Sequence, residues 1–124
     1  MNLTSPTQVK AWCIENGFHP NKTLGQNFLI DQNALKAIVD AGLEVAATSA
    51  SISVLEIGPG MGVLTEEMLK RGCKVTAIEK DPVLATELEK RVGVGEWKNL
   101  TLITGDALDV LARPSTFNLQ PSPA

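Results

Sequence analysis

The fold of this chain is decided by one stretch, Val54-Leu55-Glu56-Ile57-Gly58-Pro59-Gly60-Met61-Gly62. Its first four residues are mostly apolar and predict a short strand, and the helical pattern from Val63 to Arg71, closed by Gly72, predicts a helix directly after the glycines. Glycines between a strand and a helix carry no side chains, so a ligand can approach their backbone closely. The same glycines also fit a tight turn that binds nothing.

The pattern of strand, glycine or acidic residue, and helix repeats after this stretch. Residues 74–79 predict a second strand, Asp81 and Pro82 cap and open a second helix, and residues 100–103 predict a third strand. Strands that alternate with helices of about ten residues need crossover connections, which build a parallel sheet with helices on both faces. The predicted fold class is therefore α/β, a doubly wound sheet of the Rossmann-like kind.

Two further helices are predicted before the glycine stretch. The first starts at Ser5-Pro6-Thr7-Gln8, which offers a capping side chain and a proline at the first helical position, and it ends at Gly17. The second follows Asp31 as its cap, and its residues recur at helical spacing: Leu35, Ile38, Val39 and Gly42. Residues 20–30 between the two helices have the composition of a loop.

The chain is predicted to hold one incomplete domain. Residues 1–111 form its N-terminal part, whereas residues 112–124 lose all periodicity, hold three of the seven prolines and are expected to be a disordered or non-native tail. A sheet of three strands leaves an edge where a fourth strand should pair. We therefore expect the fold to be incomplete at its C-terminal side.

Composition and charge limit which functions the sequence by itself would suggest. A net charge of −3 carries no overall footprint of a nucleic-acid-binding protein. The chain has neither an apolar run of the roughly 20 residues that cross a bilayer nor the start of a signal peptide, so we expect a cytoplasmic protein that contacts no membrane.

Cys13 and Cys73 follow no metal-ligand or redox spacing and are expected to be reduced and buried. No metal site is predicted.

Two acidic residues are predicted to share a crevice with the glycines. Glu79 ends the second strand about 20 residues downstream, a position from which a carboxylate accepts hydrogen bonds from ribose hydroxyls. Asp106 ends the third strand and could accept a hydrogen bond from an adenine amino group, although it fits a loop residue or a helix cap equally well. The combination indicates a nucleotide-like ligand.

The glycine pattern argues against a nicotinamide dinucleotide. The motif for that class reads G-x-G-x-x-G/A, whereas here Pro59 separates the first two glycines and Val63 takes the third position. Glu56 adds a negative charge, which suits a ligand with a sulfonium and an ammonium better than one with pyrophosphate. Alternatively, Glu56 accepts hydrogen bonds from nearby backbone amides.

Four segments together resemble one family. They are Lys22-Thr23-Leu24-Gly25-Gln26-Asn27-Phe28-Leu29, Leu55-Glu56-Ile57-Gly58-Pro59-Gly60, Ile78-Glu79-Lys80-Asp81 and Gly105-Asp106-Ala107-Leu108. In order and spacing, from residue 4 to residue 111, the chain is similar to the bacterial KsgA-type rRNA adenine dimethyltransferases. The resemblance implies a class I S-adenosylmethionine-dependent fold and a monomer that methylates N6 of two neighbouring adenines of small-subunit rRNA.

The resemblance also assigns the cofactor-binding residues. Asn27 and Leu29 would line the methionine side, Gly58 and Gly60 the floor, and Glu79 and Asp106 would hold the ribose and the adenine. The catalytic residues stay unknown, because the Asn-Leu-Pro-Tyr motif that holds the flipped adenine in this family does not occur in the sequence. Residues 118–121 resemble it only superficially. His19 is read as a surface or loop residue.

Three alternatives stay open. The chain could be a catalytically inactive fragment that binds S-adenosylmethionine or RNA, or a piece of a nicotinamide-dependent oxidoreductase. It could also be a large-subunit rRNA adenine methylase, which shares the Gln-Asn-Phe-Leu segment, although residues 22–25 favour the small-subunit enzymes. Lys10 and Lys22 could contact phosphates or simply be solvated surface residues.

Overall fold

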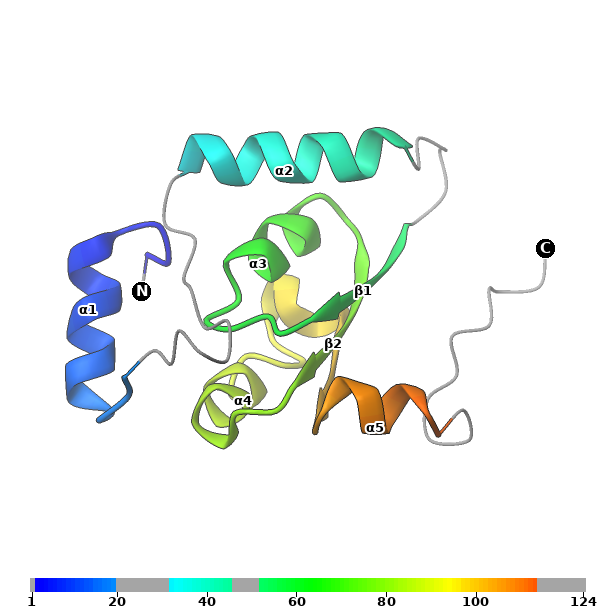
Figure 1. Cartoon of the computed structure of the whole chain (residues 1–124). Helices are drawn as coiled ribbons and strands as arrows, with labels where there is room; N and C mark the ends of the chain where they lie inside the picture. The colour runs from blue at the N-terminus through cyan, green and yellow to red at the C-terminus, as the bar shows by residue number, and fades with distance from the viewer. Residues whose placement is uncertain (1, 20–31, 46–51, 114–124) are drawn as a thin grey trace.

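The computed structural model describes residues 2–19, 32–45 and 52–113. Helices precede the sheet, and strands then alternate with helices (Figure 1), as the sequence predicts. The elements are, in order, α1 (Pro6–Glu15), α2 (Gln32–Val45), β1 (Ser53–Ile57), α3 (Val63–Lys70), β2 (Lys74–Glu79), α4 (Pro82–Glu89), η2 (Gly95–Asn99), β3 (Leu100–Thr104) and α5 (Ala107–Leu111).

The three strands form one parallel sheet in the order β1-β2-β3. Ser53 lies opposite Lys74 across the first pair, and Val75 lies opposite Leu100 across the second. The predicted α/β class with a parallel sheet is confirmed. Because β2 lies between its two neighbours, the order equals one half of a doubly wound sheet, whose strands run 1-2-3 outward from the switch point.

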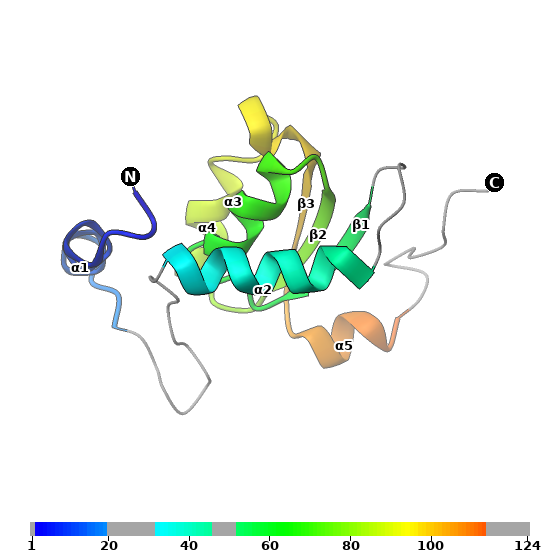
Figure 2. The ribbon, with the colours of Figure 1, turned by 90° about the horizontal axis from the view of Figure 1, so that it is seen from above.

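The helices are distributed unequally over the two faces of the sheet. Both α3 and α4 lie on one side of the strands, whereas α5 lies on the other side (Figure 1). Figure 2 shows α2 running alongside α3, which it contacts. Within the described part of the chain, only the short helix α5 represents the second layer that the sequence predicts.

The core lies between the sheet, α3 and α4. It is built by residues less than 10% exposed, among them Met61, Val63, Leu69, Val75, Ala77, Leu84 and Leu88. From α2, Leu35 and Val39 are buried as their spacing predicts, whereas Ile38 is 51% exposed. Burying the side chain of a Leu or Val contributes roughly 1.5–3 kcal/mol, so this core supplies much of the free energy that holds α3 and α4 on the sheet.

Local capping explains where the helices begin and end. Ser5 Oγ accepts a hydrogen bond from the backbone N–H of Gln8 at 3.4 Å, and Asp81 Oδ1 accepts from the backbone N–H groups of Val83 and Leu84. Gly17 and Gly72 follow α1 and α3 with φ of +62° and +86°, a conformation that glycine adopts without strain. These helix starts and stops are as predicted. The predicted cap Asp31 and residues 114–124 of the predicted tail 112–124 lie outside the described residues.

Two further expectations concern the cysteines and membranes. Cys73 is buried and Cys13 half-buried, both as free thiols, and burial raises the pKa of each. In the described ranges, no helix is long and apolar enough to cross a membrane.

Candidate functional site

The loop after β1 is held in a conformation that only glycine adopts easily. Gly58, Gly60 and Gly62 have φ of +70°, +62° and +91°. The N–H of Gly58 donates to Ile78 O at 2.9 Å, and the N–H of Gly62 donates to Pro59 O at 2.9 Å, which closes the turn that starts α3. Residues with a side chain are strained at positive φ, whereas glycine is not. The backbone conformation of the loop therefore requires glycine at these three positions.

The two ends of this loop differ in what surrounds them. A Cβ added at Gly58 would have no heavy atom of the described residues within 4 Å, so the space beside this residue is open with respect to that part of the chain. A Cβ added at Gly62 would lie 2.8 Å from the indole of Trp97 and 3.0 Å from Leu88. A ligand can therefore approach the loop closely at Gly58, whereas Gly62 packs against the protein.

Glu79 joins the glycine loop to the start of α4. Its carboxylate accepts from Gly60 N–H through Oε1 and from Asp81 N–H through Oε2, each at 3.0 Å, and the residue is only 4% exposed. A carboxylate oxygen has two lone pairs, so each oxygen keeps one for a further donor. The carboxylate therefore has capacity for up to two further hydrogen bonds.

Glu56 lies under the same loop. Its carboxylate accepts a short hydrogen bond from the hydroxyl of Thr65, a fully buried residue of α3, so its partner is a side chain rather than the backbone amide considered from the sequence. Burial raises the pKa of Glu56, the Thr65 hydrogen bond opposes this shift, and the charge of Glu79 adds to it. Two neighbouring carboxylates make this end of the sheet electronegative and suited to a cation.

Asp106 is brought next to Glu79 by the end of β3. The N–H of Gly105 donates to Glu79 O at 2.9 Å, which ties the two strand ends together. Asp106 Oδ1 accepts from the backbone N–H of Leu108 at 2.9 Å, so the helix-cap alternative is confirmed for this oxygen. Among the described residues no hydrogen bond reaches Oδ2, which leaves that oxygen available to a ligand amino group.

Other predicted residues lie elsewhere. Asn27, Leu29 and Lys22 fall outside the described residues, so their assignments stay predictions. Lys10 and His19 are exposed. In the part of the chain that the structure describes, no three His, Cys, Asp or Glu side chains gather as a metal site would require. The site therefore consists of the glycine loop and the acidic residues Glu56, Glu79 and Asp106.

Sequence reasoning missed two residues that contact the glycine loop. Arg91 Nη1 donates to Met61 O at 2.9 Å, and the ring of Trp97 covers Gly62. The short helix η2, which carries Trp97, was also missed. A signal did exist, because tryptophan is rare in this chain and Trp97 follows Gly93 and Gly95 closely.

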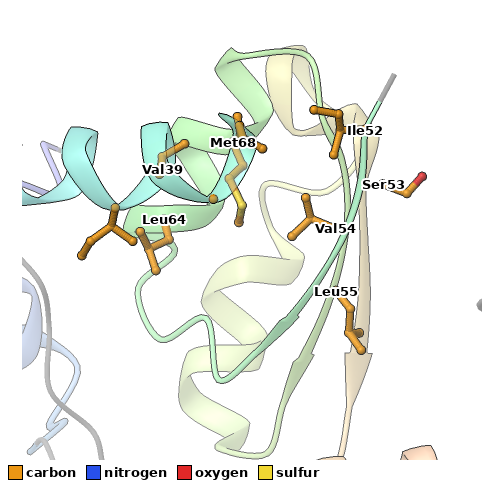
Figure 3. A pocket seen from close by; sticks show the side chains of 10 residues that line it. Val39, Ile52, Ser53, Val54, Leu55, Leu64 and Met68 are labelled. Carbon is orange, nitrogen blue, oxygen red and sulfur yellow. The ribbon is translucent and has the colours of Figure 1, made fainter. Parts of the chain in front are cut away.

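An apolar groove of about 420 Å³ lies beside the first half of β1, away from the glycine loop. Figure 3 shows Val39, Leu64, Met68 and Val54 around it, from α2, α3 and β1. Its lining offers no convergent charged group, so it does not extend the site.

Comparisons with known proteins agree on one family. The model of the family described as ribosomal RNA adenine dimethylase matches residues 17–118. Ribosomal RNA small subunit methyltransferase A of Deinococcus radiodurans is 49% identical over 111 residues, which cover 86% of this chain and 34% of that protein. The protein of the same name from Mycobacterium avium is 40% identical over 123 residues, 94% of this chain and 37% of that one. The chain thus spans about a third of the length of these relatives.

Among solved structures, the glycopeptide N-methyltransferase MtfA aligns with a TM-score of 0.48 at 28% identity, over 58% of this chain and 32% of that one. Coclaurine N-methyltransferase aligns with a TM-score of 0.49 at 27% identity, over 59% of this chain and 22% of that one.

Proposed function

This chain belongs to the ribosomal RNA adenine dimethylase family, and from that premise we propose that it binds S-adenosylmethionine at the carboxyl ends of β1, β2 and β3. In this proposal it forms the cofactor-binding part of an enzyme that dimethylates adenine N6 in small-subunit rRNA. The observation that carries the proposal is the carboxylate of Glu79, held by Gly60 and Asp81 beside a glycine loop that is open at Gly58.

The proposed contacts follow the shape and polarity of the site. Gly58 and Gly60 form the floor, Glu79 accepts from the ribose hydroxyls, and Asp106 Oδ2 accepts from the adenine amino group. Asn27 and Leu29 are proposed to line the methionine side. Support comes from the open space at Gly58 and from the hydrogen bond that brings the ends of β2 and β3 together.

Charge favours this cofactor over a dinucleotide. Glu56 and Glu79 add two carboxylates near the loop, and a pyrophosphate would be repelled by both. S-adenosylmethionine carries a sulfonium and an ammonium, and it supplies a methyl group activated by the positive sulfur. The nearby carboxylates would attract these positive charges, most effectively where the site excludes water.

The proposed reaction is displacement of the methyl group by adenine N6. The residues of this chain would contribute binding and orientation, which suffice for such a displacement without an acid–base pair. We assign no catalytic residue. The proposed partner is small-subunit rRNA, which implies a cytoplasmic site of action, and the proposed state is a monomer.

Calorimetric titration of the chain with S-adenosylmethionine tests the proposal, with NAD as comparator. We expect saturable binding of S-adenosylmethionine and none of NAD. Glu79→Gln should raise Kd roughly 10- to 100-fold, because it removes a charge-assisted hydrogen bond of ~1.5–3 kcal/mol. Glu89→Gln is the matched control, since this exposed carboxylate at the end of α4 is not part of the site. Failure of a cooperatively folded chain to bind S-adenosylmethionine would contradict the proposal.

A further inference from the structure

The glycine loop accepts a hydrogen bond from an arginine that follows α4. Arg91 Nη1 donates to the carbonyl oxygen of Met61 at 2.9 Å, and its Nη2 lies 3.4 Å from Glu87 Oε1. Its guanidinium carbon lies 5.1 Å from the centre of the Trp97 ring. Because Met61 is only 1% exposed, water cannot easily replace the arginine as donor to this carbonyl.

Trp97 holds the next residue of the same loop. The edge of its indole occupies the place that a side chain at Gly62 would take, with a distance of 2.8 Å to an added Cβ. The short helix η2 that carries Trp97 packs on α3, directly after the loop. Arg91 stacks on the same indole, so the two side chains support each other.

Three successive residues of the loop are therefore fixed by three different side chains. Glu79 holds the N–H of Gly60, Arg91 holds the carbonyl of Met61, and Trp97 packs on Gly62. None of these three contacts involves Gly58.

We infer that Arg91 and Trp97 are positioning residues for cofactor binding, which act by holding Met61 and Gly62 and touch no ligand themselves. The inference rests on the proposed function. Loss of either contact would let the loop fluctuate and weaken the hydrogen bond between Gly60 and Glu79, so the ligand would have to order the loop when it binds.

The first test measures amide hydrogen exchange in the ligand-free chain by NMR. Arg91→Met should speed exchange at Gly60 and Gly62 roughly tenfold relative to the amides of β2, since a hydrogen bond to a charged group is lost. Arg71→Met is the matched control. Arg71 also lies at the end of its helix and pairs with the glutamate four residues earlier, but its other partner is Asp40 on α2, away from the loop.

The second test measures Kd for S-adenosylmethionine. We expect a rise of roughly tenfold for Arg91→Met and for Trp97→Leu, a smaller rise for Arg91→Lys, and no change for Arg71→Met. If Arg91→Met fails to fold, Trp97→Leu decides both tests. Equal exchange and equal Kd in the loop and control variants, while the parent chain binds, would overturn this inference alone. Failure of the parent chain to bind would overturn the proposed function together with it.

Discussion

Two glycines with almost the same φ offer a sharp test of how the loop is packed. Gly62 has φ of +91° and Gly72 has φ of +86°. A Cβ at Gly62 would lie 2.8 Å from Trp97 and 3.0 Å from Leu88, whereas a Cβ at Gly72 would meet no described residue within 4 Å. Replacing either glycine by alanine places a side chain at a similar positive φ, but only Gly62→Ala would bring that side chain into overlap with its neighbours.

The expected costs follow from these distances. A left-handed residue with a Cβ costs roughly 1–2 kcal/mol, which is the whole effect expected of Gly72→Ala. Overpacking in a buried place adds ~1–3 kcal/mol, so Gly62→Ala should cost roughly 2–5 kcal/mol. The entropy that alanine removes from the unfolded chain is the same at both positions and cancels in the difference.

Urea unfolding followed by circular dichroism measures this difference directly. We expect Gly62→Ala to be less stable than Gly72→Ala by ~1–3 kcal/mol. Combining each with Trp97→Leu should shrink the gap, because residues in contact couple and distant ones do not. Equal free energies of unfolding for the two alanine variants would refute the packing of Trp97 on the loop.

Three shorter predictions concern the site. Gly58→Ala should cost about as much stability as Gly72→Ala, roughly 1–2 kcal/mol, yet raise Kd for S-adenosylmethionine at least roughly tenfold, as calorimetry would detect, because its methyl group enters the open space. Glu56→Gln should raise the melting temperature at pH 7, because burial raises the pKa of Glu56 and its charged form therefore destabilises the fold. Thermal melts at several pH values should show this gain shrinking as pH falls toward the ordinary pKa of 4.5. Asp81→Ala removes the cap of α4 and should cost ~0.5–2 kcal/mol in urea unfolding, with Asp109→Ala as an exposed control.

Local chemistry explains what was predictable. The starts of α1 and α4 follow from Ser5 and Asp81, whose short side chains satisfy the first backbone N–H groups of each helix. The parallel sheet follows from the alternation of elements, since a helix between two strands provides the crossover that parallel strands need.

Contacts between distant segments were not predictable. Arg91 is 30 residues from Met61, and neither residue type indicates a partner at that distance. The short hydrogen bond between Glu56 and Thr65 likewise depends on how α3 is set against β1. The role of Asp106 could not be decided from the sequence either, because a helix cap and a ligand acceptor need the same residue type in the same place.

The carboxylate of Glu79 has a consequence for the thermodynamics of any ligand that reaches it. A free glutamate side chain loses up to roughly 1.5–2 kcal/mol of rotamer entropy when it is immobilised. Here Gly60 and Asp81 have already confined both oxygens during folding. A pair of incoming hydroxyls would thus bind to an acceptor whose side-chain entropy was already lost during folding. Less of the contact energy is then offset on binding, and the affinity is higher.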